Sequence, residues 1–137
     1  MGHNLFRDWF FDRMIWILLN GEWTIKIKDF KNSKNKRYNN LFGLTDPYQD
    51  KEGGIIYLDK QRGIPRILIH ELGHIILGNI LDNEATQRYQ TAKRINRWAE
   101  DQVLVFESSF YSSLSVAQIK VLKNFIERAK IDSRYNI

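Results

Sequence analysis

The sequence predicts an α+β protein of one domain, in which a small, mostly antiparallel sheet packs on a central helix and further helices complete the core. Two segments, 23–28 and 55–59, have the alternating or β-branched composition of strands. Three longer segments repeat apolar residues at the spacing of helices, and a fourth, 65–79, is apolar nearly all round. The 137 residues, 43% of them hydrophobic, suffice for one core, so residues 1–137 are expected to form a single domain.

The first half of the chain supplies one helix and the expected strands. Residues 5–19 place apolar side chains on a broad helical face, and Asn20-Gly21 ends that helix. The face consists of Leu5, Phe6, Trp9, Phe10, Met14 and Ile17. Residues 23–28 alternate apolar and polar side chains, which predicts a strand with one face in the core and a basic face in water. A short second strand is expected within 38–45, and the strand 55–59 directly precedes the next helix.

Three helices are expected in the second half. The first covers about 65–79 and is apolar nearly all round, so it should be buried. Residues 82–90 are polar and predict a loop or a short helix, and helical periodicity returns over 92–106. The last helix starts at a capping box in 115–118, and residues 131–137 are expected to fray.

The helix at 65–79 carries the residues with the clearest chemistry. His70 and His74 lie four residues apart, so a helix places both imidazoles on one face, where they can bind one metal ion. Glu71 lies about 100° around the helix axis from His70, which suits a proton acceptor that is not a ligand. The competing interpretation is a wet face on a surface helix. The apolar flanking residues argue against it, because they indicate a buried helix. Polar groups that are buried without partners cost free energy, so these three are expected to face a cleft and a metal ion.

A catalytic zinc site usually has three protein ligands, so a third ligand must come from elsewhere in the chain. The chain has no cysteine and no histidine after His74, which leaves carboxylates. The candidates are Asp82, Glu84, Glu100, Asp101 and Glu107. Glu100 is favoured because it borders the apolar stripe of its helix, whereas Asp101 points into solvent. Glu107 shares the face of Glu100 and is its main competitor, followed by Glu84.

These motifs resemble the zincin metallopeptidases of gluzincin type, and among them the ImmA/IrrE family. The resemblance rests on residues 54–58, on 70–74, and on Glu100-Asp101-Gln102 after the histidines. It implies a compact zincin-like fold with one Zn²⁺ per chain, held by His70, His74 and Glu100. It also implies a cytoplasmic endopeptidase that cuts a specific protein partner, such as a transcriptional repressor.

The mechanism expected at such a site is hydrolysis by metal-activated water, with Glu71 as the general base. An extended substrate is expected to pair with the strand 55–59 by strand addition, although an ordinary edge or core strand is an equal alternative. Donors available to the developing oxyanion are Tyr57, Tyr89, Arg97 and Tyr111.

Two other classes of function remain open. The net charge is +5, and residues 26–37 hold six Lys or Arg against the single Asp29. This segment favours contact with nucleic acid by a nucleic-acid-associated metalloprotease, unless it is only a solvated strand face and loop. A non-catalytic zincin-like binding module is the other alternative. The apolar run 14–19 is too short to span a bilayer, so a soluble cytoplasmic protein is expected.

Overall fold

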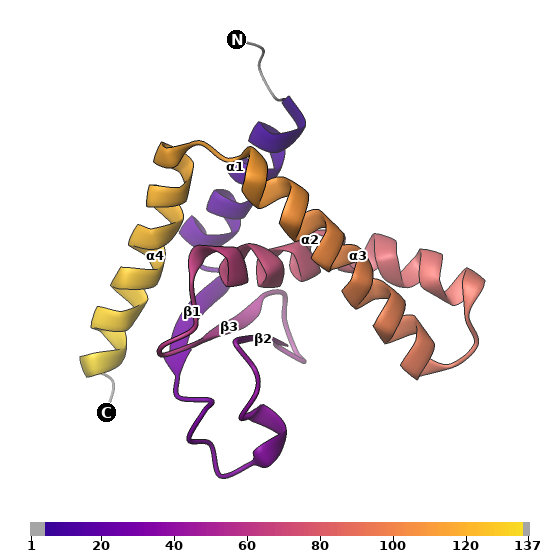
Figure 1. The fold of residues 1–137 in the computed structure, drawn as a ribbon, viewed down its shortest axis with the longest axis horizontal. Helices are drawn as coiled ribbons and strands as arrows, with labels where there is room; N and C mark the ends of the chain where they lie inside the picture. Colours follow the sequence, from indigo (N-terminus) through magenta and orange to yellow (C-terminus); the bar gives the residue numbers. More distant parts are fainter. Residues whose placement is uncertain (1–4, 136–137) are drawn as a thin grey trace.

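The computed structural model describes residues 5–135, with four helices and three strands (Figure 1). His3 and residues 136–137 lie outside the described residues. The elements follow the order α1 (Leu5–Leu19), β1 (Trp23–Lys28), η1 (Lys36–Tyr38), β2 (Gly43–Pro47), β3 (Gly54–Asp59), α2 (Pro65–Arg88), α3 (Ala92–Ser113) and α4 (Val116–Tyr135). The α+β class is therefore confirmed.

The sheet has the strand order β1-β3-β2. Strand β2 pairs antiparallel with β3, whereas β1 pairs parallel with it, so the sheet is mixed rather than mostly antiparallel. The parallel pair is possible because the connection formed by residues 29–42 is long enough to carry the chain to the far side of β3. β3 is consequently the central strand, and β1 and β2 are the edges.

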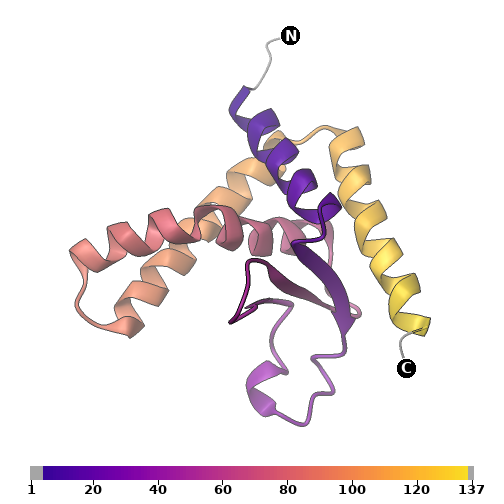
Figure 2. The same cartoon turned by 180° about the vertical axis from the view of Figure 1, so that it is seen from behind.

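One face of the sheet packs into the core, and helix α2 crosses the molecule beside it. Figures 1 and 2 show α1 and α4 at one end of α2, while the α2–α3 hairpin projects at the other end. Ile56 and Leu58 of β3 are fully buried on this face. They belong to a cluster that also includes Met14, Ile17, Leu68, Ile69, Leu72, Leu122 and Ile126. Burial of this cluster fixes α2 against the sheet.

Helix α2 is longer than its apolar pattern predicts. It continues through the polar segment 82–88, where a loop or separate short helix was expected, and ends only at Arg88. Ala85 is fully buried, and Glu84 pairs with Arg88 one turn later, so both packing and a local ion pair support the extension. The expectation of a buried helix holds only for its first half, because Ile80 is 68% exposed in the projecting hairpin.

Strand β2 and helix α1 also differ from expectation, the strand in its first residue and the helix in the burial of its apolar face. Strand β2 starts at Gly43, later than expected, because residues 36–38 form a short 3₁₀-helix and Asn39–Phe42 carry no strand. Helix α1 has the expected bounds, but only Phe10, Met14 and Ile17 of its apolar face are buried. Leu5, Phe6 and Trp9 are exposed.

Within residues 5–135, no helix combines the length and apolar character that a membrane span requires.

The capping box at the start of α4 is confirmed. Gln118 N–H donates to the Ser115 hydroxyl at 3.1 Å, and Ser115 N–H donates to Gln118 Oε1 at 3.0 Å. The apolar stripe that follows buries Leu122, Ile126 and Ala129. The helix continues to Tyr135 and so includes most of the segment expected to fray.

A buried carboxylate holds the corner between β3 and α2. Asp59 is 1% exposed and accepts hydrogen bonds from the backbone N–H groups of Phe30, Gln61 and Arg62 and from the Arg62 guanidinium. Burial alone would raise the pKa of Asp59, but these hydrogen bonds outweigh it and lower the pKa to about 2. The same guanidinium donates to the carbonyls of Asn39 and Leu41, so this corner also anchors the connection that leads into β2.

This corner predicts a loss of stability in acid. A folded-state pKa below the ordinary 3.8 stabilises the fold above pH 3.8, and that stabilisation is lost as the pH falls through about 2. The shift corresponds to about 2 kcal/mol. Asp59→Asn should lower the free energy of unfolding by about this amount at neutral pH and flatten its decline between pH 4 and pH 2. Urea unfolding across this range checks it, with the exposed Asp50→Asn as control, and an unchanged acid decline in Asp59→Asn would contradict it.

Candidate metal centre

His70 and His74 lie one turn apart on the half of α2 that packs against the sheet. Their Nε2 atoms are 3.2 Å from each other, and their rings are 4.8 Å apart between centroids. The side chains are 12% and 29% exposed, so both sit at the base of a cleft rather than on the open surface. The two imidazoles therefore converge on one point, as the spacing predicts.

Glu100 from α3 completes this convergence. Its Oε1 lies 2.8 Å from Nε2 of His70, and its Oε2 lies 2.8 Å from Nε2 of His74. Helix α3 can approach α2 closely at Gly73, where an added Cβ would stand 3.2 Å from the Phe106 ring and 3.3 Å from Val103. The carboxylate chosen from the sequence thus faces the same ring nitrogens of both histidines.

Glu107 does not lie where a third metal ligand would lie. Its Oε1 lies 2.8 Å from Nδ1 of His70, on the opposite side of that ring from Glu100, and its Oε2 accepts a hydrogen bond from Arg66. A carboxylate at Nδ1 favours the tautomer in which Nδ1 carries the proton and Nε2 keeps its lone pair free. Glu107 therefore orients His70, and the sequence alone did not separate this role from that of a ligand.

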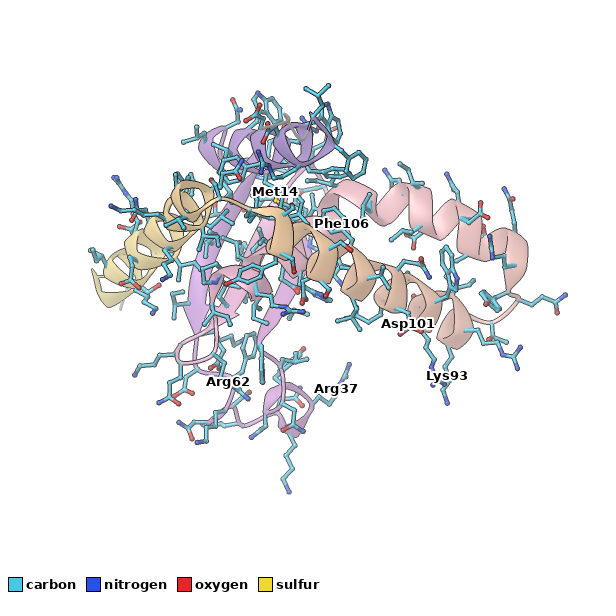
Figure 3. All side chains as sticks on the ribbon, turned by 45° about the horizontal axis from the view of Figure 1, so that its top comes forward. Met14, Arg37, Arg62, Lys93, Asp101 and Phe106 are labelled. Carbon is cyan, nitrogen blue, oxygen red and sulfur yellow. The ribbon has the colours of Figure 1, made fainter. Side chains whose placement is uncertain are left out.

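The remaining carboxylate candidates do not reach the histidines. Glu84 lies ten residues beyond His74 on the same helix, about 15 Å along its axis. There it pairs with Arg88. Asp82 is exposed, and Asp101 lies on the exposed side of α3 (Figure 3).

Glu71 is buried beside the histidines and covered by β2. It is 6% exposed, and a Cβ added at Gly43 would stand 3.1 Å from its Cγ. Burial raises the pKa of Glu71 above its ordinary value, although the charges of His70 and His74 oppose the rise. A hydrogen bond from the backbone of Thr45 also favours the ionised form. Gly43 was not singled out from the sequence, since its importance arises only from the crossing of β2 over α2.

The charges of the centre are strongly coupled. Burial lowers the pKa of His70, but the hydrogen bond to Glu100 and the surrounding carboxylates outweigh burial and raise it overall. Hydrogen bonds from His70 and His74 hold the pKa of Glu100 well below its usual range. The carboxylate is therefore ionised near neutral pH, which is the form that binds a cation.

These residues line a cleft of about 470 Å³, whose other wall is the segment Asn40–Thr45. The strand beside the cleft is thus β2, an edge strand. The expectation that residues 55–59 border it and pair with a substrate is wrong, because β3 is already paired on both sides. Leu104 and Asn40 also line the cleft, and no sequence signal pointed to them. The described residues that line the cleft include none of the four expected oxyanion donors, Tyr57, Tyr89, Arg97 and Tyr111.

The donor set fits a divalent metal ion. Ligand atoms of His70, Glu71 and His74 lie within 4.8 Å of one another, and Glu100 adds the carboxylate nearest to both imidazoles. Two imidazole nitrogens and one carboxylate oxygen are a set that suits zinc, and the buried Glu107 supports one of these ligands, His70.

Comparisons with family models, with curated proteins and with solved structures find no match to this chain.

The geometry predicts a graded effect of three glutamates on zinc affinity. Glu100→Ala should weaken zinc binding by more than about 100-fold, since it removes a ligand, and Glu107→Ala by about 10- to 100-fold, since it removes an orienting partner. Glu84→Ala is the matched control and should leave the affinity unchanged. Competition with a chromophoric chelator measures all three variants. A larger loss in Glu107→Ala than in Glu100→Ala would reverse the two assigned positions.

Proposed function

We propose that this protein is a zinc-dependent metallopeptidase. The observation that carries the proposal is the position of the Glu100 carboxylate, 2.8 Å from Nε2 of both His70 and His74. Glu100 lies on α3 and the two histidines lie on α2, so these side chains meet only because the two helices pack together. Their meeting therefore supports a metal site independently of the sequence motif in α2. The family resemblance of the sequence agrees with the same three ligands.

In this proposal, His70, His74 and Glu100 hold the zinc, and Glu107 keeps Nε2 of His70 directed toward it. Zinc at such a site supplies Lewis acidity, which polarises a carbonyl and lowers the pKa of water toward neutrality. Glu71 is the general base: it accepts a proton from the attacking water and delivers it to the leaving amine. Its raised pKa and its burial beside both histidines suit this transfer.

The substrate binds as an extended segment along the free edge of β2. Phe42 C=O accepts from Asp59 N–H, and Tyr48 N–H donates to Gly53 C=O, both at 2.9 Å, so these alternate residues face β3. The pleat then turns the backbone groups of Gly43 and the carbonyl of Thr45 toward the open edge and the cleft, while the Thr45 N–H donates to Glu71. A peptide paired there would run past Glu71. Strand addition recognises backbone and therefore favours flexible protein segments.

The substrate is a specific protein partner, a transcriptional regulator of the repressor type, and the enzyme acts in the cytoplasm. Both assignments rest on the resemblance to the ImmA/IrrE family. The buried and hydrogen-bonded environment of Glu71 favours an enzyme over a non-catalytic module of the same fold.

The test is cleavage by the zinc-loaded protein of a regulator encoded beside its gene, with casein as a general substrate. Chelation should stop cleavage, and added zinc should restore it. Cleavage of casein with no cleavage of any neighbouring regulator would leave the peptidase and overturn the regulatory substrate. Cleavage of neither substrate, by protein shown to contain zinc, would favour the binding module.

A further inference from the structure

The charge of this protein is concentrated in one short segment. Residues 26–37 hold six of the 21 Lys and Arg and one of the 16 Asp and Glu, which leaves 15 of each sign elsewhere. The formal net charge of +5 therefore equals that of this segment, which we call the basic segment. Such an arrangement differs from the mixed charges of an ordinary solvated surface.

All six cations of the basic segment are exposed, and among the described residues none forms an ion pair. The one acid, Asp29, accepts hydrogen bonds from Asn32. The segment comprises the second half of β1 and the start of the connection to β2. This connection lies at the opposite end of the molecule from α1 (Figure 1). Arg37 lies at its outer end (Figure 3). Lys28 Nζ lies over the rings of Phe30, Tyr38 and Tyr57, but its charge, like those of the other five cations, has no carboxylate partner among the described residues. All six cations can therefore meet an anionic ligand.

A hollow of about 450 Å³ adjoins the basic segment. Its walls include Lys28 at the end of β1, Lys60 after β3, and Lys130 on α4. Asp29 also lines it, and Lys130 is 3.4 Å from Glu127, so positive charge exceeds negative charge around the hollow. Lys60 and Lys130, from two distant parts of the chain, thereby extend the cationic surface of the basic segment.

We propose that the basic segment and this hollow bind the phosphodiester backbone of nucleic acid. A dense array of unpaired cations matches a polymer that carries a regular line of negative charge. A membrane surface is a poorer match, because residues 26–37 offer no exposed large apolar side chain to insert, and Phe30 is fully buried. The contacts are to phosphates and are therefore independent of base sequence.

This site is separate from the candidate metal centre and does not rest on the proposed function. Its residues do not line the cleft. The connection that carries them does continue into Asn40–Thr45, and Arg62 holds the carbonyls of Asn39 and Leu41 at that junction. Bound nucleic acid would therefore lie beside the wall of the cleft.

The test is fluorescence anisotropy of labelled single-stranded DNA, duplex DNA and RNA at several salt concentrations. Lys31→Gln/Lys34→Gln/Lys36→Gln removes three cations from the basic segment. The matched control, Lys93→Gln/Lys120→Gln/Lys123→Gln, removes three exposed cations elsewhere. We expect the first variant to bind about tenfold more weakly or worse, and its slope of log affinity against log salt to fall by about 2 to 3. The control should match the wild type, and so should the zinc content of both variants.

Three results would overturn the proposal. One is wild-type binding that does not change with salt, and another is an equal loss in the control variant. The third is equal or tighter binding to poly-glutamate or to vesicles of anionic lipid, which would identify an acidic protein or a membrane as the ligand. The three nucleic acids distinguish strand type and sugar, and measurable binding to any of them with the expected salt slope supports the site.

Discussion

Replacing both His70 and His74 by alanine is expected to abolish zinc binding. The wild type should contain about one zinc per chain, and the double variant essentially none, because a single carboxylate at Glu100 remains of the proposed ligand set. Zinc should also stabilise only the wild type against unfolding. At a free zinc concentration about 1,000 times the dissociation constant, that stabilisation amounts to about 4 kcal/mol.

Elemental analysis and chemical unfolding with and without zinc measure this effect. The double variant also loses the hydrogen bond between His70 and Glu107, so its fold should be compared with the wild type without metal. Glu84→Ala serves as the control, since it removes a carboxylate from the same helix away from the histidines. Full zinc content in the folded double variant would eliminate the candidate metal centre.

Glu71→Gln is expected to separate metal binding from chemistry. Glutamine has nearly the same shape and fits beneath Gly43, but it cannot accept a proton from water. Zinc content and stability should remain close to those of the wild type, while the rate of peptide hydrolysis should fall by about 10²- to 10⁴-fold. The variant should still bind substrate and is therefore suited to capturing it uncleaved.

Single-turnover cleavage of the candidate regulator measures the rate, and binding of the same regulator to the variant measures retention of the substrate site. Glu100→Gln is a useful contrast, because it should lose both zinc and activity. Wild-type rates in Glu71→Gln would assign the proton transfer to another group. Loss of zinc from Glu71→Gln would instead make Glu71 a ligand.

Features that depend on local spacing could be predicted before the fold was known. Four residues of helix bring His70 and His74 together whatever surrounds them, and the bonds between Ser115 and Gln118 span a single turn. The selection of Glu100 also came from a helical pattern, since its place beside the apolar stripe indicates the side that faces α2. Alternation in 23–28 likewise predicted which side of β1 is exposed.

Features that depend on segments distant in the chain became visible only in the folded protein. Glu100 and Glu107 share one face of α3, but they contact opposite nitrogens of the His70 ring. Glu100 at Nε2 is placed as a ligand, and Glu107 at Nδ1 is placed as an orienting partner. The insertion of β3 between β1 and β2 made β2 the edge beside the cleft, and packing on α3 extended α2 to Arg88. Strand order and interhelical packing depend on burial summed over the whole chain, which no local spacing specifies.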